Sequence, residues 1–277
     1  MSGALTFNGK TAASLGLRIG GVTPYGSPGR EVQSFYVPGR IGAVYPAKDY
    51  TSLPNEIREY AAALYKRAGS METVERAMAD IRDWLFNVDG YAELRDSYEP
   101  QFYRRAYFTG DFTPVRKGAG QNFEIPLRFS CDPRRFIVGN HDIQVSAAGS
   151  SATYITTPSI EGFEIRDPSR PLIYISTAGE SVTISFSPVP DGVPYGQIIL
   201  NGGGRARDFY FDAETYNAWF PEGSVYEAEA TYPFGTNTAN GEIADVLGDI
   251  RIGPGQTKIS FNSSTVLLII TPRWWVR

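Results

Sequence analysis

Apolar side chains recur every three or four positions after Ser70, and this spacing predicts one amphipathic α-helix over residues 71–86. Ser70 is a suitable N-cap, because its hydroxyl can accept a hydrogen bond from the first turn. Gly90, which follows a short polar stretch, limits the helix at its other end. The expected apolar face consists of Met71, Val74, Met78, Ile81 and Leu85.

Alternation with a period of two dominates the rest of the first half and predicts strands. It is clearest over Ala92–Leu94, Tyr103–Phe108 and Phe123–Phe129. Near the start of the chain, Asn8-Gly9 suits the type I′ turn of a tight hairpin. Residues 56–66 are ambiguous, since their alanines and apolar spacing allow a helix while their alternation equally allows a strand.

Composition changes between Asn140 and Thr157, where Ser, Ala, Thr and Gly are frequent and large apolar residues are few. We therefore expect a domain boundary there, with one domain over residues 1–140 and a second over residues 141–277. The second domain has no helical pattern, and its short apolar runs are separated by Pro and Gly, which is typical of a β-sandwich. The runs are Ile160–Ile165, Leu172–Ser176, Ser181–Ser185, Gln197–Leu200, Phe209–Phe211, Ser224–Glu229, Ile250–Ile252, Thr257–Phe261 and Leu267–Thr271.

Composition and charge narrow the class of protein. The 17 Tyr and 16 Phe, with 29 Gly and 19 Pro, favour many strands joined by turns. A net charge of −4 argues against a dominant nucleic-acid surface. No apolar run reaches the roughly 18 residues of a membrane helix, and the N-terminus lacks the pattern of a secretory signal. These features fit a protein that is made and assembled in a cytoplasm.

The residues with reactive side chains predict no catalytic or metal site. His141 is the only histidine, and no nucleophile motif accompanies it, so we expect an exposed loop residue. Cys131 is the only cysteine and ends an alternating strand, which favours a buried side chain. One His and one Cys are too few for a soft-metal centre. We expect no cofactor, no metal and no enzymatic activity.

Acidic pairs in the second domain leave one enzymatic alternative open, a β-sandwich glycosidase. Glu161 with Glu164, or Glu227 with Glu229, could act as acid and nucleophile. Polar alternation on a solvated sheet face explains these residues better.

Two further sets of residues are candidates for binding. Trp219, Tyr226 and Tyr232 could stack on sugar rings, although core packing and subunit contacts compete as explanations. Arg40 lies in a Pro-Gly-Arg-Ile-Gly turn, where its guanidinium could make bidentate contacts across a subunit interface or could simply be solvated.

The order of short motifs along the chain resembles the distal tail protein (Dit) family of long-tailed phages. Each motif alone is weakly specific, but their order extends over nearly the whole sequence. The motifs are Phe7-Asn8-Gly9, Pro38–Gly42, Trp84-Leu85, Gly90–Leu94, Asp96–Pro100, Phe129–Pro133, Pro171–Ile175, Asp212–Asn217 and Ile270–Trp275.

This resemblance implies a mainly β protein with one α-helix. Its N-terminal part would be a β-barrel-like, α+β, ring-forming domain, and its C-terminal part a galectin-like (jelly-roll) β-sandwich. Under the family fold, the ambiguous residues 56–66 would be a strand.

The resemblance also implies a function: a virion structural protein at the tail tip, assembled in the host cytoplasm. As a baseplate or tip hub subunit it would form a hexameric ring with a channel through which DNA passes without specific binding. Its partners would be further copies of itself, a tail tube or terminator protein, a tail-associated tip protein, and possible tape-measure and receptor-binding proteins, with no membrane insertion. The alternative is a carbohydrate-binding adhesion module of a phage tail or cell surface.

Overall fold

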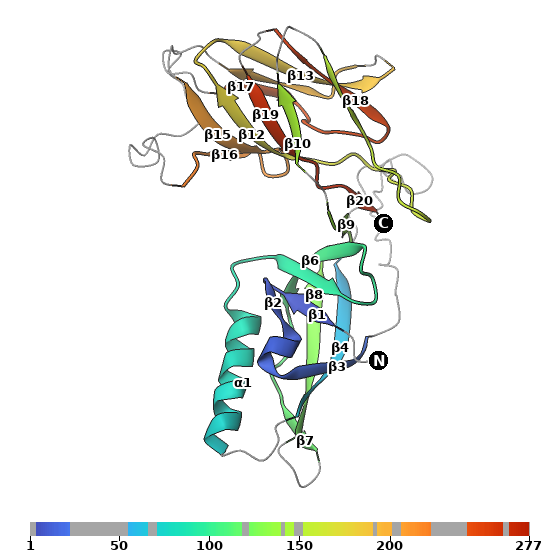
Figure 1. The fold of residues 1–277 in the computed structure, drawn as a ribbon, viewed down its shortest axis with the longest axis vertical. Coiled ribbons are helices and arrows are strands. Elements are labelled where there is room, and N and C mark those ends of the chain that lie inside the picture. Colours follow the sequence, from blue (N-terminus) through green and yellow to red (C-terminus); the bar gives the residue numbers. More distant parts are fainter. Residues whose placement is uncertain are drawn as a thin grey trace, which may run out of the picture. The chain divides into compact units, whose positions relative to one another are not determined.

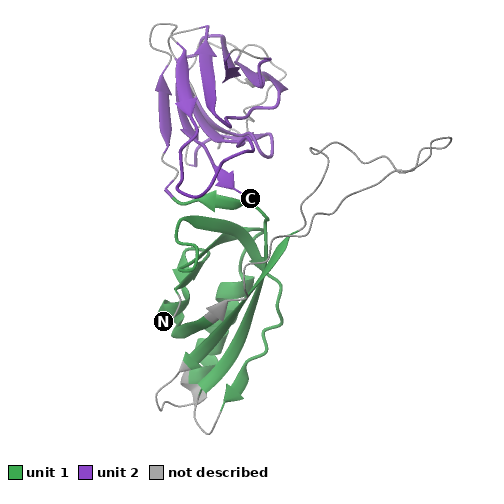
Figure 2. Ribbon diagram, turned by 90° about the vertical axis from the view of Figure 1, so that its right-hand side faces the viewer, with its two compact units in different colours: residues 1–138, 277 green, residues 139–276 purple. Residues whose placement is uncertain are grey.

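The computed structural model describes residues 4–22, 55–65, 71–117, 122–139, 142–146, 152–190, 193–200, 206–222, 243–262 and 266–276. The chain divides into two compact units, unit 1 over Met1–Val138 and unit 2 over Gly139–Val276, which Figure 2 shows in different colours. The fold is mainly β with one α-helix, as the sequence predicts (Figure 1).

Unit 1 is built on one curled antiparallel sheet with the strand order β2-β1-β5-β6-β8-β4-β3, to which β7 adds beside β8 and β9 beside β6. The elements are β1 (Leu5–Phe7), β2 (Lys10–Thr11), the 3₁₀-helix η1 (Ala12–Leu15), β3 (Leu17–Val22), β4 (Glu56–Tyr65), α1 (Met71–Phe86), β5 (Ala92–Asp96), β6 (Phe102–Phe108), β7 (Val115–Lys117), β8 (Asn122–Cys131) and β9 (Arg135–Ile137).

Helix α1 has the predicted bounds and covers the core of unit 1 (Figure 1). Ile81 and Leu85 are buried, as expected, and Trp84 joins them although the spacing argument did not include it. The Trp84 indole Nε1 donates a 2.8 Å hydrogen bond to the carbonyl oxygen of Phe7. Two motifs that lie far apart in the sequence therefore meet in the core, where their aromatic rings also make an edge-to-face contact.

The turn between β1 and β2 confirms the predicted hairpin. Asn8 and Gly9 both have positive φ angles, 48° and 73°, as a type I′ turn requires at its two central positions.

Of the ambiguous residues 56–66, Glu56–Tyr65 form strand β4 in spite of their alanines, as the family resemblance implies, and Lys66 lies outside the described residues. Strand β4 pairs along its whole length with β8, and β3 pairs on its other side. Its side chains alternate, with Arg58, Tyr60 and Ala62 buried while Ile57 and Glu59 are exposed. Pairing on both edges and burial of one face thus override a modest helix propensity.

Unit 2 is a β-sandwich of two five-stranded antiparallel sheets, with the orders β10-β19-β12-β15-β16 and β11-β18-β13-β14-β17. The chain passes between the two sheets repeatedly, since β10 and β12 lie in the first sheet and β11 and β13 in the second. The strands are β10 (Ile143–Ser146), β11 (Thr153–Thr156), β12 (Leu172–Thr177), β13 (Val182–Val189), β14 (Gly196–Leu200), β15 (Arg207–Asp212), β16 (Asn217–Trp219), β17 (Ile243–Gly248), β18 (Gln256–Phe261) and β19 (Leu267–Thr271). The short strand β20 (Trp275–Val276) follows them and belongs to neither of these two sheets.

Two details of unit 2 differ from the sequence-based expectation. The runs Ile160–Ile165 and Ile250–Ile252 were expected to be strands. The first forms a turn closed by a single bridge between Ile160 and Phe163, and the second contributes only the bridge between Ile252 and Ser169. The run Ser224–Glu229 lies outside the described residues. Conversely, the Ser- and Thr-rich stretch 140–157 contains strands β10 and β11. Each of these strands buries only one large apolar side chain, Val145 or Ile155, so the hydrophobic pattern is too weak to predict either strand.

Candidate functional site

The inward face of strand β4 changes from apolar to charged along its length. Leu64, Ala62 and Tyr60 belong to the apolar core of unit 1, and the next two inward positions are Arg58 and Glu56. The guanidinium groups of Arg58 and Arg104, the latter on β6, are almost wholly enclosed, with 4% and 7% of their side chains exposed. Charged side chains at such depth need partners, because burying an unpaired charge is costly.

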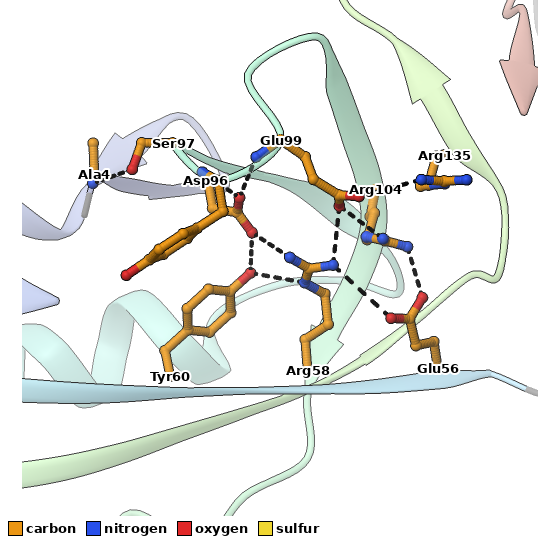
Figure 3. A network of polar contacts seen from close by, with 10 residues as sticks. Ala4, Glu56, Arg58, Tyr60, Asp96, Ser97, Glu99, Arg104 and Arg135 are labelled. Carbon is orange, nitrogen blue, oxygen red and sulfur yellow. Dashed lines mark hydrogen bonds and ion pairs between the residues drawn. The ribbon is translucent and has the colours of Figure 1, made fainter. Parts of the chain in front are cut away.

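The partners form what we call the charge cluster: Glu56, Arg58, Tyr60, Asp96, Glu99, Arg104 and Arg135 (Figure 3). Arg58 lies at its centre. The Arg58 Nη2 atom donates to Asp96 Oδ2 at 2.8 Å and Nη1 donates to Glu99 Oε2 at 3.0 Å. Its Nε atom donates to the Tyr60 hydroxyl at 3.2 Å, and that hydroxyl donates to Asp96 Oδ2 at 2.6 Å.

Arg104 and Arg135 complete the charge cluster. Arg104 Nη1 donates to Glu56 at 2.7 Å and Nη2 donates to Glu99 Oε2 at 2.8 Å. Arg135 Nη1 reaches the other Glu99 oxygen at 3.3 Å. The cluster therefore balances three arginines against three carboxylates and ties β4, β6 and β9 to the turn after β5.

Asp96 anchors that turn through its second carboxylate oxygen. Asp96 Oδ1 accepts the backbone N–H groups of Tyr98 and Glu99 at 2.9 and 3.0 Å. An aspartate that accepts from the backbone two and three residues later makes an Asx turn. This contact gives a physical reason for the Asp96–Pro100 motif. One carboxylate oxygen of Asp96 binds the backbone of the turn, and the other binds Arg58.

The electrostatics of the charge cluster favour a fixed protonation state. Burial opposes the positive charge of Arg58, but Tyr60, Asp96 and Glu99 together raise its pKa above the ordinary value. Burial raises the pKa of the Tyr60 hydroxyl, and Asp96 adds to this effect while Arg58 opposes it. The Arg58 guanidinium and the Tyr60 hydroxyl therefore stay protonated throughout the physiological pH range. Each carboxylate oxygen of Asp96 and of Glu99 accepts at least one hydrogen bond. This arrangement suits a rigid brace rather than a proton-transferring centre.

Cys131 is buried at the edge of the charge cluster, as predicted, and it is opposite Glu56 in the β4–β8 register. Burial raises the pKa of its thiol to about 12, although Arg104 and Arg58 act in the opposite direction. A thiol in this state is a poor nucleophile at neutral pH.

Of the predicted binding residues, only Trp219 lies in the described part of the chain. Arg40, Tyr226 and Tyr232 lie outside the described residues, as do His141, Glu227 and Glu229. Glu161 and Glu164 are exposed next to a turn, and Glu164 pairs with Arg166 at 2.8 Å.

Among the described residues, no group of His, Cys, Asp and Glu is arranged to hold a metal ion. In the same residues, the one α-helix is too short and too polar to cross a membrane.

Trp219 belongs to an aromatic row on the outer face of the sheet β10-β19-β12-β15-β16. Tyr174 on β12 pairs in register with Tyr210 on β15, and Tyr210 pairs with Trp219 on β16. The Tyr174 and Tyr210 ring centroids are 5.2 Å apart, and those of Tyr210 and Trp219 are 5.6 Å apart with the planes 20° from parallel. Sequence reasoning missed Tyr174 and Tyr210, although both alternate with buried residues and so had to point outward.

Two more motifs meet within unit 2. Arg273 of the Ile270–Trp275 motif donates to both carboxylate oxygens of Asp212 at 2.7 and 3.3 Å, and Asp212 begins the Asp212–Asn217 motif. Such a bidentate pair fixes geometry more firmly than a single contact.

The comparisons with known proteins agree with this architecture. The structure matches the SPP1 Dit (gp 19.1) protein, described as a paradigm of the hub adsorption apparatus in phages that infect Gram-positive bacteria, with a TM-score of 0.61 and 12% sequence identity. It also matches a chain of the phage P2 baseplate in its activated conformation with Ca, with a TM-score of 0.50 and 11% identity. In both cases the match covers 98% of this chain and 98% of the other.

No protein-family model matches the sequence, and the comparison with curated proteins gives no match. The likeness thus lies in the fold: over nearly its whole length the chain has the architecture of a Dit-type tail hub protein.

Proposed function

We propose that this protein is a structural subunit of a phage tail tip, a distal tail protein that forms a hexameric ring between the tail tube and the tip proteins. The observation that carries the proposal is the extent of the fold likeness, which covers 98% of both this chain and the SPP1 Dit protein. A likeness confined to a common β-sandwich would carry little functional weight, because one fold hosts many functions. Here the pairing of a curled, helix-covered sheet with a sandwich is matched as a whole.

The role in such a ring is geometric and needs no catalysis. Identical subunits that contact one another head to tail close into a ring when the rotation between neighbours is right. The charge cluster supports this role, since it braces the strands of unit 1 and would keep neighbouring subunits at a constant angle. A net charge of −4 is compatible with a channel that lets DNA pass without holding it.

An exposed surface on unit 1 is suited to the contact between copies. Ile57 on β4 and Tyr107 on β6 both face outward beside Ser130 on β8, and Tyr91 contacts the Tyr107 ring with centroids 5.2 Å apart. These three large side chains are 39–49% exposed. We assign this outer-face patch, Ile57, Tyr91 and Tyr107, to the contact with a second copy of the chain, because grouped exposed aromatic side chains are typical of interface centres.

The first experiment measures the mass of the full chain by size-exclusion chromatography with light scattering, alone and after mixing with the tail tube protein of the same phage. The proposal expects a species of six times the protomer mass of 30.5 kDa. Electron microscopy of that species should show a ring with a central hole. A protomer that stays monomeric under both conditions contradicts the proposal.

Single substitutions then locate the interface. Tyr107→Glu places a charge in the outer-face patch and should shift the hexamer toward monomer, because burying an unpaired carboxylate is costly. The matched control is Tyr154→Glu, at a tyrosine of unit 2 that is 52% exposed. Arg40→Glu tests the predicted assembly role of Arg40, and an unchanged ring mass would remove Arg40 from the interface.

A further inference from the structure

A groove lies beside the aromatic row of unit 2, on the same outer sheet face. Its apolar lining includes Leu172 and Ile269, its aromatic lining is Tyr174 and Tyr210, and its carboxylates are Asp142 and Asp208. Leu172 and Tyr174 are alternate residues of β12, and Ile269 is opposite Tyr174 on β19. Strand pairing thus holds apolar, aromatic and acidic groups together in one shallow depression.

The polar groups of the groove retain capacity to accept hydrogen bonds. Asp142 Oδ1 accepts from the Thr271 hydroxyl at 2.6 Å. Burial raises the pKa of Tyr174, and the nearby, hydrogen-bonded Asp208 carboxylate raises it further. A carboxylate has about four acceptor sites, so one or two internal hydrogen bonds leave each Asp able to accept from a ligand. The ligand must therefore offer several donors.

The charge of the groove restricts the ligand further. Among the described residues that line the groove, two are carboxylates and none is Lys, Arg or His, so these residues disfavour an anionic ligand. A cation held in an aromatic cage needs ring faces turned toward one central point. Here the Tyr174 and Tyr210 rings are tilted by 58° and the Tyr210 and Trp219 rings are stacked, so the three rings form a row along the sheet and not a cage.

A neutral ligand with hydroxyl donors and apolar C–H faces satisfies all of these conditions. We propose that this groove binds a neutral saccharide, with Asp142 and Asp208 accepting from its hydroxyls and Leu172, Ile269 and the tyrosine rings contacting its C–H faces. Trp219 extends the site: Tyr210 stacks on one of its faces, its side chain is 43% exposed, and β16 is the last strand in the described sheet order. Its other face can therefore stack on a further sugar ring.

The proposal does not depend on ring formation, so the two can fail separately. Binding is measured with the full chain by calorimetry and by ligand-observed NMR, with lactose, maltotriose and chitotriose as neutral probes. Trigalacturonate serves as the acidic probe and choline as the cationic probe. We expect at least one neutral probe to bind with a dissociation constant between about 0.1 and 10 mM, the weak range natural to a shallow groove. Absence of binding by all three neutral probes at about 10 mM, or tighter binding of trigalacturonate or choline, would overturn the proposal.

Substitutions identify the groove as the site. Asp208→Asn, Tyr174→Ala and Trp219→Ala should each weaken binding of the neutral probe about tenfold, the effect of losing one good contact. Tyr154→Ala is the matched control, because Tyr154 is an exposed tyrosine on the other sheet of the same unit, and it should leave binding unchanged. Unchanged thermal melting of each variant shows that it is folded. Binding that survives all three substitutions, or that is lost in the control, would contradict the assignment.

Discussion

The charge cluster of unit 1 and the aromatic row of unit 2 use polar groups in opposite ways. In the charge cluster, both Asp96 oxygens have donors and the Arg58 side chain is 4% exposed. In the aromatic row, Trp219 is 43% exposed and Asp208 is exposed beside a groove. Polar groups that satisfy one another inside a domain stiffen it, whereas polar groups with capacity left over at a surface can take a ligand. The difference favours a structural role for the first region and is consistent with the recognition role that we propose for the second.

The largest effect is expected from breaking the charge cluster at its centre. Arg58→Met leaves Asp96 and Glu99 enclosed with one cation fewer, and removing one partner of a buried ion pair typically costs about 3–5 kcal/mol. Urea unfolding followed by hydrogen exchange in peptides from residues 92–131 measures the loss in unit 1 separately from unit 2.

The control for this prediction is Arg128→Met. The Arg128–Glu59 pair of the same sheet is 54% exposed on both sides, and such a pair contributes at most about 1 kcal/mol. Adding Asp96→Asn to Arg58→Met removes one negative charge and should restore part of the stability. If Arg58→Met and Arg128→Met cost the same, the charge cluster is not a brace, and the contrast with unit 2 is lost.

More of the overall fold can be predicted from the sequence than of the charge cluster and the aromatic row. Helix 71–86 and the Asn8-Gly9 turn follow from local rules, because spacing and backbone preference act over a few residues. Local rules could not show that β4 is a strand, because its pairing with β3 and β8 joins segments that are distant in the sequence. The family resemblance resolved it instead.

The charge cluster, and the aromatic row apart from Trp219, were missed for a related reason. Arg104 occupies an inward position between Phe102 and Ala106, and Arg58 occupies one beside Tyr60, so a charge at a core position was a readable signal. Its partners, however, come from the turn after β5 and from β9, and only the folded sheet brings them together. Likewise, the alternation of Tyr174 with buried neighbours predicts an outward side chain, but its register with Tyr210 is a property of strand pairing.

An intermediate effect is expected at Cys131, which reports whether water reaches the edge of the charge cluster. Its pKa is raised by burial to about 12, so the folded state keeps the thiol protonated at a pH where the unfolded state has lost the proton. The unfolded state then binds fewer protons, and stability falls as pH rises from about 9 toward 12. Relative to pH 7, Cys131 accounts for a loss of about 2–3 kcal/mol at pH 11.

Cys131→Ala removes this contribution, so its urea stability should decline less between pH 7 and pH 11 than that of the parent chain. Comparing the two slopes cancels the packing defect that the substitution itself creates. Thiol labelling at pH 8 gives a second measurement: the native protein should react only as fast as it unfolds. Rapid labelling of the folded protein would mean that the charge cluster is open to solvent. It would then resemble the unit 2 groove in solvent exposure, contrary to our argument.

The smallest effect is expected at Trp219, where the comparison can be made between two tryptophans of one unit. Trp219→Ala loses a stacking contact at an exposed edge strand, which is worth about 1 kcal/mol or less. Trp274→Ala removes a ring that is 3% exposed, and truncating a buried tryptophan costs about 3–5 kcal/mol. Chemical unfolding of unit 2, followed by hydrogen exchange, compares the two variants directly. A large side chain that contributes little to stability but, by our proposal, much to saccharide binding is what a recognition surface requires. Equal losses for the two variants would make the aromatic row part of the structural framework, as the charge cluster is.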